Sequence, residues 1–281
     1  MHHGASLFLL LYNRGMNIVS TLPKLKENKL ISALIVAWVL TMISLPIVRA
    51  IASESFFYGM VTFGVLMQAT AVFVIVQTAW GWSRTVQALL VIAVLTWLVE
   101  AIGSATGLPF GQYSYTENLQ PQLAHVPLII PLAWFMMLPP AWAIAQKVAG
   151  DNRWVFILVS ALALTAWDLF LDPQMVAWNL WVWEQPGGYF GIPWLNYGGW
   201  LLTAVVVTAV VMALVRLPRL PLYPLLLIYT ITWALETIGL LFFWQLIGPG
   251  LVGFVGMGLF VYLGWRGSGV AGWRGGEVAT E

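Results

Sequence analysis

The chain has 281 residues, of which 60% are hydrophobic and only 8% are charged. A soluble domain needs a larger charged surface, so this composition predicts an integral membrane protein. The net charge of +1 gives no reason to expect a nucleic-acid partner, and the lack of cysteine excludes disulfides and zinc–thiolate sites.

Apolar windows close to the ~20 residues needed to cross ~30 Å of hydrocarbon follow one another along most of the chain. They predict an all-α fold, a polytopic bundle of about eight transmembrane helices, or seven if the short, glycine-rich last window does not span. Residues 1–29 then form an N-terminal extension, residues 30–265 the transmembrane domain and residues 266–281 a tail. The windows are residues 30–48, 56–78, 86–106, 126–146, 154–172, 198–215, 222–247 and 250–265.

Basic residues are distributed unequally between the two sides of an eight-helix arrangement. Eleven of them fall on one side and Arg49 alone falls on the other. By the positive-inside rule the basic side is cytoplasmic, so we expect a multi-pass protein of the cell membrane with both termini in the cytoplasm. The connections at 107–125 and 173–197 then lie outside. The eleven residues are Arg14, Lys24, Lys26, Lys29, Arg84, Lys147, Arg153, Arg216, Arg219, Arg266 and Arg274.

Three acidic residues lie at the same depth in helices that run in the same direction. Glu100, Asp168 and Glu236 each follow the start of the third, fifth or seventh window by about fourteen residues. At 1.5 Å per residue this is roughly 21 Å from the cytoplasmic side. A short repeat, residues 96–103 and 232–239, places Glu100 and Glu236 at equivalent positions. We therefore expect the three acids to converge on one cavity.

A second acid follows Asp168 by four residues, so Asp168 and Asp172 share a helix face. Pro173 disfavours helical geometry at the residue before it, which predicts that the helix ends at this pair. Carboxyl groups within a membrane are costly unless they face a protein interior, and their default interpretation is a functional site.

Carboxylic acids among aromatic rings are the chemistry that this sequence offers. In low dielectric a carboxyl group favours its protonated form and can act as a proton donor. The 17 Trp, 9 Tyr and 14 Phe supply ring faces that attract a cation. Acid and rings together suit protonation of an alkene to a carbocation. Many of the rings are expected in interfacial belts, and those nearest the aspartates are the better candidates: Trp167, Trp178, Trp181 and Trp183.

Four strings between about Glu100 and Trp200 resemble the carotenoid 1,2-hydratase family, which includes the bisanhydrobacterioruberin hydratases. They are GLPFGQYSYT (Gly107 to Thr116), VPLIIPLAWFMM (Val126 to Met137), DLFLDPQMV (Asp168 to Val176) and YFGIPWLNYGGW (Tyr189 to Trp200). The resemblance implies cofactor-free and metal-free addition of water to the terminal 1,2 double bond of a ψ end group, as in lycopene or γ-carotene. Further candidate substrate-binding residues within these strings are Tyr113, Tyr115, Trp134, Tyr189 and Asn196.

The roles of the acids are inferred from chemistry and not from the resemblance. Asp168 is expected to be the general acid or its direct partner, because it lies deeper than Asp172 and beside Trp167. Asp172 is expected to orient the attacking water or to cap the loop. Glu100 and Glu236 complete the set of candidate catalytic residues.

Other functions stay open at this point. A carotenoid cyclase also begins by protonating an end group, but it must keep water away from the cation. An isoprenoid transferase would use the Asp168 and Asp172 pair to hold magnesium and a diphosphate. A proton-coupled transporter also has intramembrane acids and repeats. Besides a lipophilic carotenoid, the expected partners are membrane lipid and other carotenoid-pathway enzymes.

Overall fold

The computed structural model describes residues 28–217 and 219–266. Seven helices in this part of the chain are long and apolar enough to cross a membrane, which confirms the predicted all-α membrane bundle. Arg14, Lys24, Lys26, Arg274 and most of the predicted extension and tail lie outside the described residues. The helices are α3 (Lys29–Ile51), α4 (Glu54–Thr106), α5 (Ile129–Ala149), α6 (Arg153–Ala177), α7 (Trp194–Val215), α8 (Leu222–Ile238), which continues as the π-helix η1 (Gly239–Phe243), and α9 (Ile247–Arg266).

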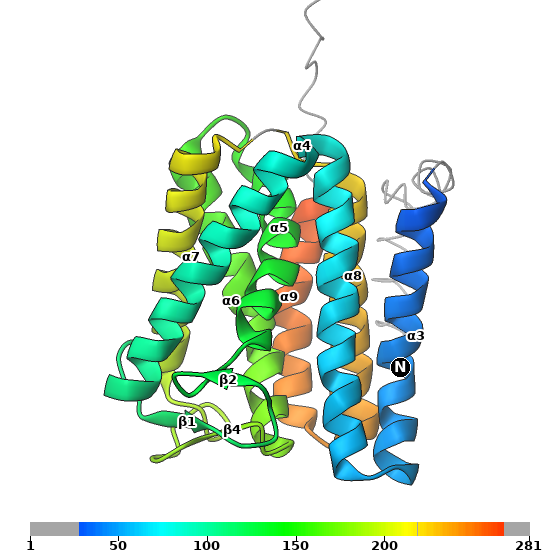
Figure 1. Cartoon of the computed structure of the whole chain (residues 1–281), viewed down its shortest axis with the longest axis vertical. Helices are drawn as coiled ribbons and strands as arrows, with labels where there is room; N and C mark the ends of the chain where they lie inside the picture. The colour runs from blue at the N-terminus through cyan, green and yellow to red at the C-terminus, as the bar shows by residue number, and fades with distance from the viewer. Residues whose placement is uncertain (1–27, 218, 267–281) are drawn as a thin grey trace, which may run out of the picture.

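Helix α4 accounts for two of the predicted spans. Its 53 residues would extend for about 80 Å as a straight helix, more than twice the thickness of the hydrocarbon core. The backbone leaves helical geometry at Gly81, where φ is 75° and ψ is 171°. The two arms of α4 run in opposite directions from this bend (Figure 1). With each arm counted as a span, the described part of the chain crosses the membrane eight times.

Helix α5 lies at the centre of the bundle and packs against α4, α6, α8 and α9. Most of its side chains are buried, as expected for a helix surrounded by other helices. Helix α3 is peripheral, because it packs mainly against α4 and makes only limited contact with α8 (Figure 1). Lys29, Arg84, Lys147, Arg153, Arg216, Arg219 and Arg266 lie at one end of the helices, and Arg49 lies at the other.

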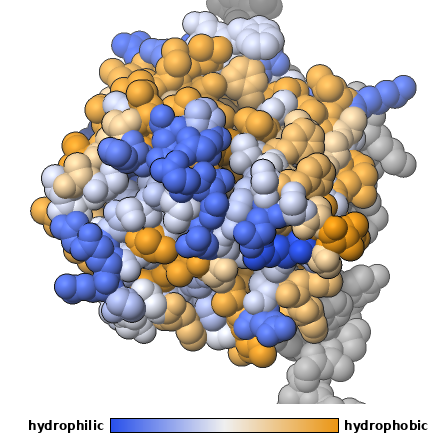
Figure 2. All heavy atoms as spheres, turned by 60° about the horizontal axis from the view of Figure 1, so that its bottom comes forward, coloured by the Kyte–Doolittle hydropathy of each residue, from blue (hydrophilic) through white to orange (hydrophobic). Residues whose placement is uncertain are grey.

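Short strands at the Arg49 end join the two long connections, an arrangement that the sequence did not predict. Strand β1 (Tyr113–Tyr115) pairs with β4 (Trp181–Trp183) in an antiparallel register, and β2 (Gln122–Leu123) pairs with β3 (Val126–Pro127). Hydrophilic residues gather on this end of the molecule, and apolar residues predominate around its flanks (Figure 2).

The predicted end of the fifth window at Asp172 is wrong, because α6 continues through Pro173 to Ala177. Proline has no N–H, so the carbonyl of Leu169, one turn earlier, loses its helical partner. The hydroxyl of Tyr189 donates to that carbonyl at 3.0 Å. This bond replaces the missing one, and Asp172 consequently sits inside the helix with a fixed orientation.

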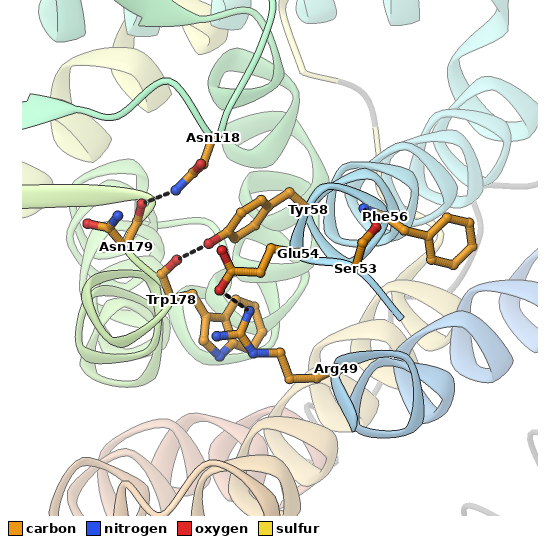
Figure 3. Close-up of polar contacts among 8 residues, drawn as sticks. All are labelled: Arg49, Ser53, Glu54, Phe56, Tyr58, Asn118, Trp178 and Asn179. Atoms are coloured by element: carbon orange, nitrogen blue, oxygen red, sulfur yellow. Dashed lines mark hydrogen bonds and ion pairs between the residues drawn. The ribbon is translucent and has the colours of Figure 1, made fainter. Parts of the chain in front are cut away.

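Contacts between distant segments hold the end of α6 in place (Figure 3). The hydroxyl of Tyr58 on α4 donates to the carbonyl of Trp178 at 3.1 Å, and the amide of Asn118 donates to the carbonyl of Asn179 at 2.9 Å. Beside them Arg49 and Glu54 form an ion pair with an N–O distance of 3.7 Å across the turn between α3 and α4. Trp178 is thereby fixed against the cavity that it lines.

Candidate active site

One cavity, with about 1110 Å³ of empty space including its mouth, opens among the helices toward the end that carries the strands. Three acids line it: Glu100 from α4, Asp172 from α6 and Glu236 from α8. Their side chains are buried, with exposed fractions of 4%, 2% and 7%. Asp168 is completely buried but does not line the cavity. We expected Asp168 on the cavity wall, and Asp172 occupies that position instead.

Glu100 is held by three hydrogen-bond donors. Tyr113 and Tyr115 donate to its Oε2 at 2.5 and 2.8 Å, and the indole of Trp134 donates to Oε1 at 3.3 Å. The tyrosines are two residues apart in β1, so both side chains reach the same face of the strand. Burial and the nearby Glu100 carboxyl raise the pKa of both tyrosines above the ordinary value of about 10. They therefore remain O–H donors at neutral pH.

Asp168 and Asp172 form a pair that Asn196 bridges. The Asn196 amide donates to Oδ2 of Asp168 at 3.1 Å and also to Oδ2 of Asp172. The indole of Trp181 donates to Oδ1 of Asp172 at 3.1 Å. The two carboxyl groups also lie within hydrogen-bonding reach of each other, as their spacing of one helical turn predicts. Asn196, expected to bind substrate, contacts both aspartates and also lines the cavity.

Glu236 lies in a second cluster of polar side chains. In the amide orientation that satisfies both neighbours, Gln174 donates to Oε2 of Glu236 at 3.1 Å and accepts from the indole of Trp244 at 3.2 Å. One turn before Glu236, the hydroxyl of Thr232 accepts from the amide of Gln68 at 3.3 Å. Apart from Trp244, all of these residues line the cavity.

Tryptophan rings form much of the remaining wall. Trp134 stacks on Trp200 with ring centroids 4.3 Å apart and planes 12° apart. Trp167 meets the same Trp200 ring edge-on, at 6.1 Å and 82°. The other expected aromatic residues on the wall are Trp178, Trp181, Trp183, Tyr113 and Tyr115. Rings in these orientations present both faces and edges to an occupant.

Tyr189 is the expected binding residue that the structure places elsewhere. It does not line the cavity but packs with Ile192 and Tyr197 in a separate small cluster, with its hydroxyl on the freed carbonyl of Leu169. The sequence did not predict many of the other wall residues, among them Trp38, Gln68, Gln174 and Trp200. Gln68 could have been found in the sequence as an amide inside an apolar span. Gln174 could have been found as an amide that follows the aspartate pair.

Comparison with known proteins adds the family. A family model described as "Carotenoid biosynthesis protein" matches residues 57–237, well over half of the chain. The bisanhydrobacterioruberin hydratase of Haloarcula japonica is 32% identical over 123 residues, which amount to 42% of this chain and 42% of that relative. The alignment thus covers less than half of the relative's length. No solved structure matches. The matched residues include all four buried acids and most of the cavity wall, and the chain belongs to the carotenoid biosynthesis protein family.

Proposed function

We propose that this protein adds water to the terminal 1,2 double bond of a carotenoid ψ end group, such as that of lycopene or γ-carotene. The observation that carries the proposal is a bridged pair of carboxyl groups at the wall of a tryptophan-lined cavity. The reaction needs a proton donor, a shielded site for a cation and one water, and side chains can provide the first two. The likeness to a protein named as a hydratase supports the same reaction.

The hydrogen bonds of the aspartate pair indicate where its proton lies. Both oxygens of Asp172 accept N–H bonds, as suits an ionised carboxylate. Asp168 accepts through Oδ2, whereas its buried Oδ1 has no hydrogen-bond partner among the described residues. Two carboxyl groups so close together cannot both ionise readily, so the pair holds one proton. Asp168 stores that proton, and Asp172 passes it to the substrate.

The proposed reaction proceeds in two steps. The proton leaves an Asp172 oxygen for C2, and the electron pair of the C1–C2 double bond forms the new C–H bond. C1 becomes a tertiary cation. Its charge is stabilised by the surrounding rings, each worth up to ~2 kcal/mol when desolvated, and by the Glu100 carboxylate that Tyr113, Tyr115 and Trp134 hold. Water then forms a C1–O bond and gives a proton to a second carboxylate, which leaves a tertiary alcohol.

The other candidate functions fit the cavity less well. A cyclase must exclude water from its cation, yet Gln68, Gln174 and Glu236 place polar groups on this wall. A transferase would need lone pairs of the aspartates for magnesium, and indole and amide N–H groups take three of these oxygens. A transporter would need a polar pathway, and most of the wall is aromatic or aliphatic.

The proposal places the protein in the cell membrane with its basic end in the cytoplasm. The seven basic residues at that end support the orientation, as the positive-inside rule requires. The cavity then opens near the outer half of the bilayer. A carotenoid dissolved in the hydrocarbon would reach it with one end group while the rest of the polyene stays in lipid.

Expression in a lycopene-accumulating host, followed by mass spectrometry of the extracted pigments, tests the proposal. We expect lycopene to gain the mass of one water for each end group that reacts. A cyclic product without added mass would support the cyclase instead. Unchanged lycopene beside normal amounts of the protein in the membrane would contradict the proposal.

A further inference from the structure

We infer that Glu236 holds the attacking water and accepts its proton, and that Gln174 and Gln68 are the residues that position it. This inference rests on the proposed hydration and decides which carboxylate serves as the base. Two carboxylates besides the aspartate pair line the cavity, Glu100 and Glu236. The choice between them follows from the hydrogen bonds that each already makes.

Glu100 has little acceptor capacity left. Two hydroxyl groups fill Oε2, and the Trp134 indole takes one position on Oε1. A carboxylate offers about four lone-pair sites, so three of the four are occupied. A base whose charge is spread over three donors is also less able to take a proton from water. Glu100 is therefore suited to balance the charge of the cation and not to activate water.

Glu236 has the opposite pattern. Gln174 donates to its Oε2, and within the described part of the chain Oε1 has no hydrogen-bond partner. The side chain lines the cavity, so this oxygen is available to an occupant. A water that donates to Oε1 keeps a lone pair for bond formation at C1. This is the arrangement that a general base requires.

The structure fixes Glu236 through a chain of neighbours. Gln174 can donate to Glu236 only while its carbonyl oxygen points to the indole of Trp244. Trp244 follows the π-helix η1, which begins three residues after Glu236. A π-turn changes the direction in which subsequent side chains leave the helix, and such turns are frequent at functional sites. The π-turn thus places the Trp244 indole where it donates to the Gln174 carbonyl oxygen. This contact leaves the Gln174 amide N–H directed at Glu236.

Gln68 supplies a second polar contact on the same wall. Its amide nitrogen is bound to the Thr232 hydroxyl, which itself donates to the carbonyl of Ile228 at 3.0 Å. Thr232 and Glu236 are one turn apart on the same face of α8. Gln68 therefore meets α8 on the cavity wall one turn before Glu236, and its carbonyl oxygen is a suitable acceptor for the other hydrogen of the water.

The chemical step balances with water as the only co-reactant. The water oxygen forms a bond to C1, and one of its O–H bonds breaks as the proton moves to Oε1 of Glu236. The substrate gains the elements of water, and the aspartate pair is short of one proton. Return of the proton from Glu236 to that pair, through water in the cavity, restores the enzyme.

The test separates protonation from water capture. Membranes that contain the full-length protein are incubated with lycopene in D₂O, and both hydrated product and deuterium in unhydrated lycopene are measured. In Glu236→Gln the pair Asp168 and Asp172 can still deuterate C2, but the cation then loses a proton instead of gaining water. We expect hydration to fall at least ~100-fold. Unhydrated lycopene that carries deuterium should accumulate in its place.

A second variant tests the positioning residue. Gln174→Met keeps the length of the side chain but removes the donor to Glu236, and we expect reduced hydration with deuterium uptake retained. Asp172→Asn should lose both signals and serves as the contrasting variant. Glu184→Gln, an exposed glutamate outside the cavity, is the matched control and should behave as the wild type.

Each outcome has a defined meaning. Hydration at the wild-type level in Glu236→Gln overturns the inference, and so does loss of both signals in Glu236→Gln and Gln174→Met when both variants reach the membrane in normal amounts. In either case the proposed hydratase function stands. A wild-type protein that neither hydrates nor deuterates lycopene contradicts the proposed function itself.

Discussion

The donors around each buried acid determine what that acid can do. Glu100 accepts hydrogen bonds from three donors. The pair of Asp168 and Asp172 accepts from two donors, and one oxygen of the pair has no partner among the described residues. Glu236 accepts from one donor. All four acids lie on the cavity wall or directly behind it, away from bulk solvent. Their properties therefore differ according to the hydrogen bonds that each acid makes. Four acids in similar membrane positions are therefore suited to different tasks.

Substitution of the aspartate pair tests the proton donor. Asp168→Asn and Asp172→Asn are nearly isosteric, but an amide cannot release a proton at accessible pH. General acid catalysis is typically worth ~100- to 10,000-fold, and we expect both variants to lose hydration to that extent. Product is measured in membranes matched for protein amount, with the exposed Asp151→Asn as control. Near-normal hydration by Asp168→Asn alone would leave Asp172 as the acid without a need for Asp168, and near-normal hydration by both variants would move the acid to Glu100 or Glu236.

At the scale of elements, the repeated segments 96–103 and 232–239 make the same contacts. Thr96 and Thr232 donate to the carbonyl one turn earlier, and Trp97 and Trp233 donate to backbone carbonyls of neighbouring segments. The glutamate of each copy lines the cavity. The final glycines, at 103 and 239, leave room for the rings of Phe110 and Trp244. The repeat is thus a packing unit that presents an acid to the cavity.

Two adjacent glycines of α7 provide a test of how this helix is positioned. A Cβ on Gly199 would lie 2.7 Å from both the Phe110 ring and the Pro109 carbonyl oxygen, whereas a Cβ on Gly198 meets nothing within 4 Å. Overpacking typically costs about 1–3 kcal/mol, so we expect Gly199→Ala to lower the Tm in detergent. Gly198→Ala should leave the Tm unchanged or raise it, because alanine favours helix. Equal Tm values for the two variants would contradict this close packing of α7.

At the scale of the whole molecule, eight spans separate a basic end from an end that carries the strands. The β1 and β4 register places Tyr113 opposite Trp183 and Tyr115 opposite Trp181. The two long connections therefore close the cavity together, with donors to Glu100 from one and a donor to Asp172 from the other. This assembly requires both connections on the same side of the membrane.

The absence of cysteine from the sequence makes this orientation directly measurable. Glu117→Cys introduces one thiol in the connection before α5, and Asp151→Cys introduces one between α5 and α6; both positions are exposed. We expect a membrane-impermeant maleimide to label Glu117→Cys in intact cells. Asp151→Cys should react only after the cells are opened. The reverse pattern would invert the proposed topology.

The sequence by itself determined the membrane class, a bundle of seven or eight spans and the presence of acids inside that bundle. Each of these follows from local composition, because about twenty apolar residues must cross the bilayer and a carboxyl group among them must avoid lipid. The positions of Glu100 and Glu236 on the cavity wall were also predictable, because their helices run in parallel and carry them at equal depth.

The tertiary structure decided which groups contact which. The rotation of α6 places Asp172 and not Asp168 on the wall, and the bond from Tyr189 to Leu169 lets this helix continue through Pro173. The pairing of β1 with β4 and the contact of Gln174 with Glu236 join residues that are more than sixty positions apart. Sequence periodicity fixes the spacing along one helix but not its rotation against the others, and only packing of the whole bundle sets that rotation.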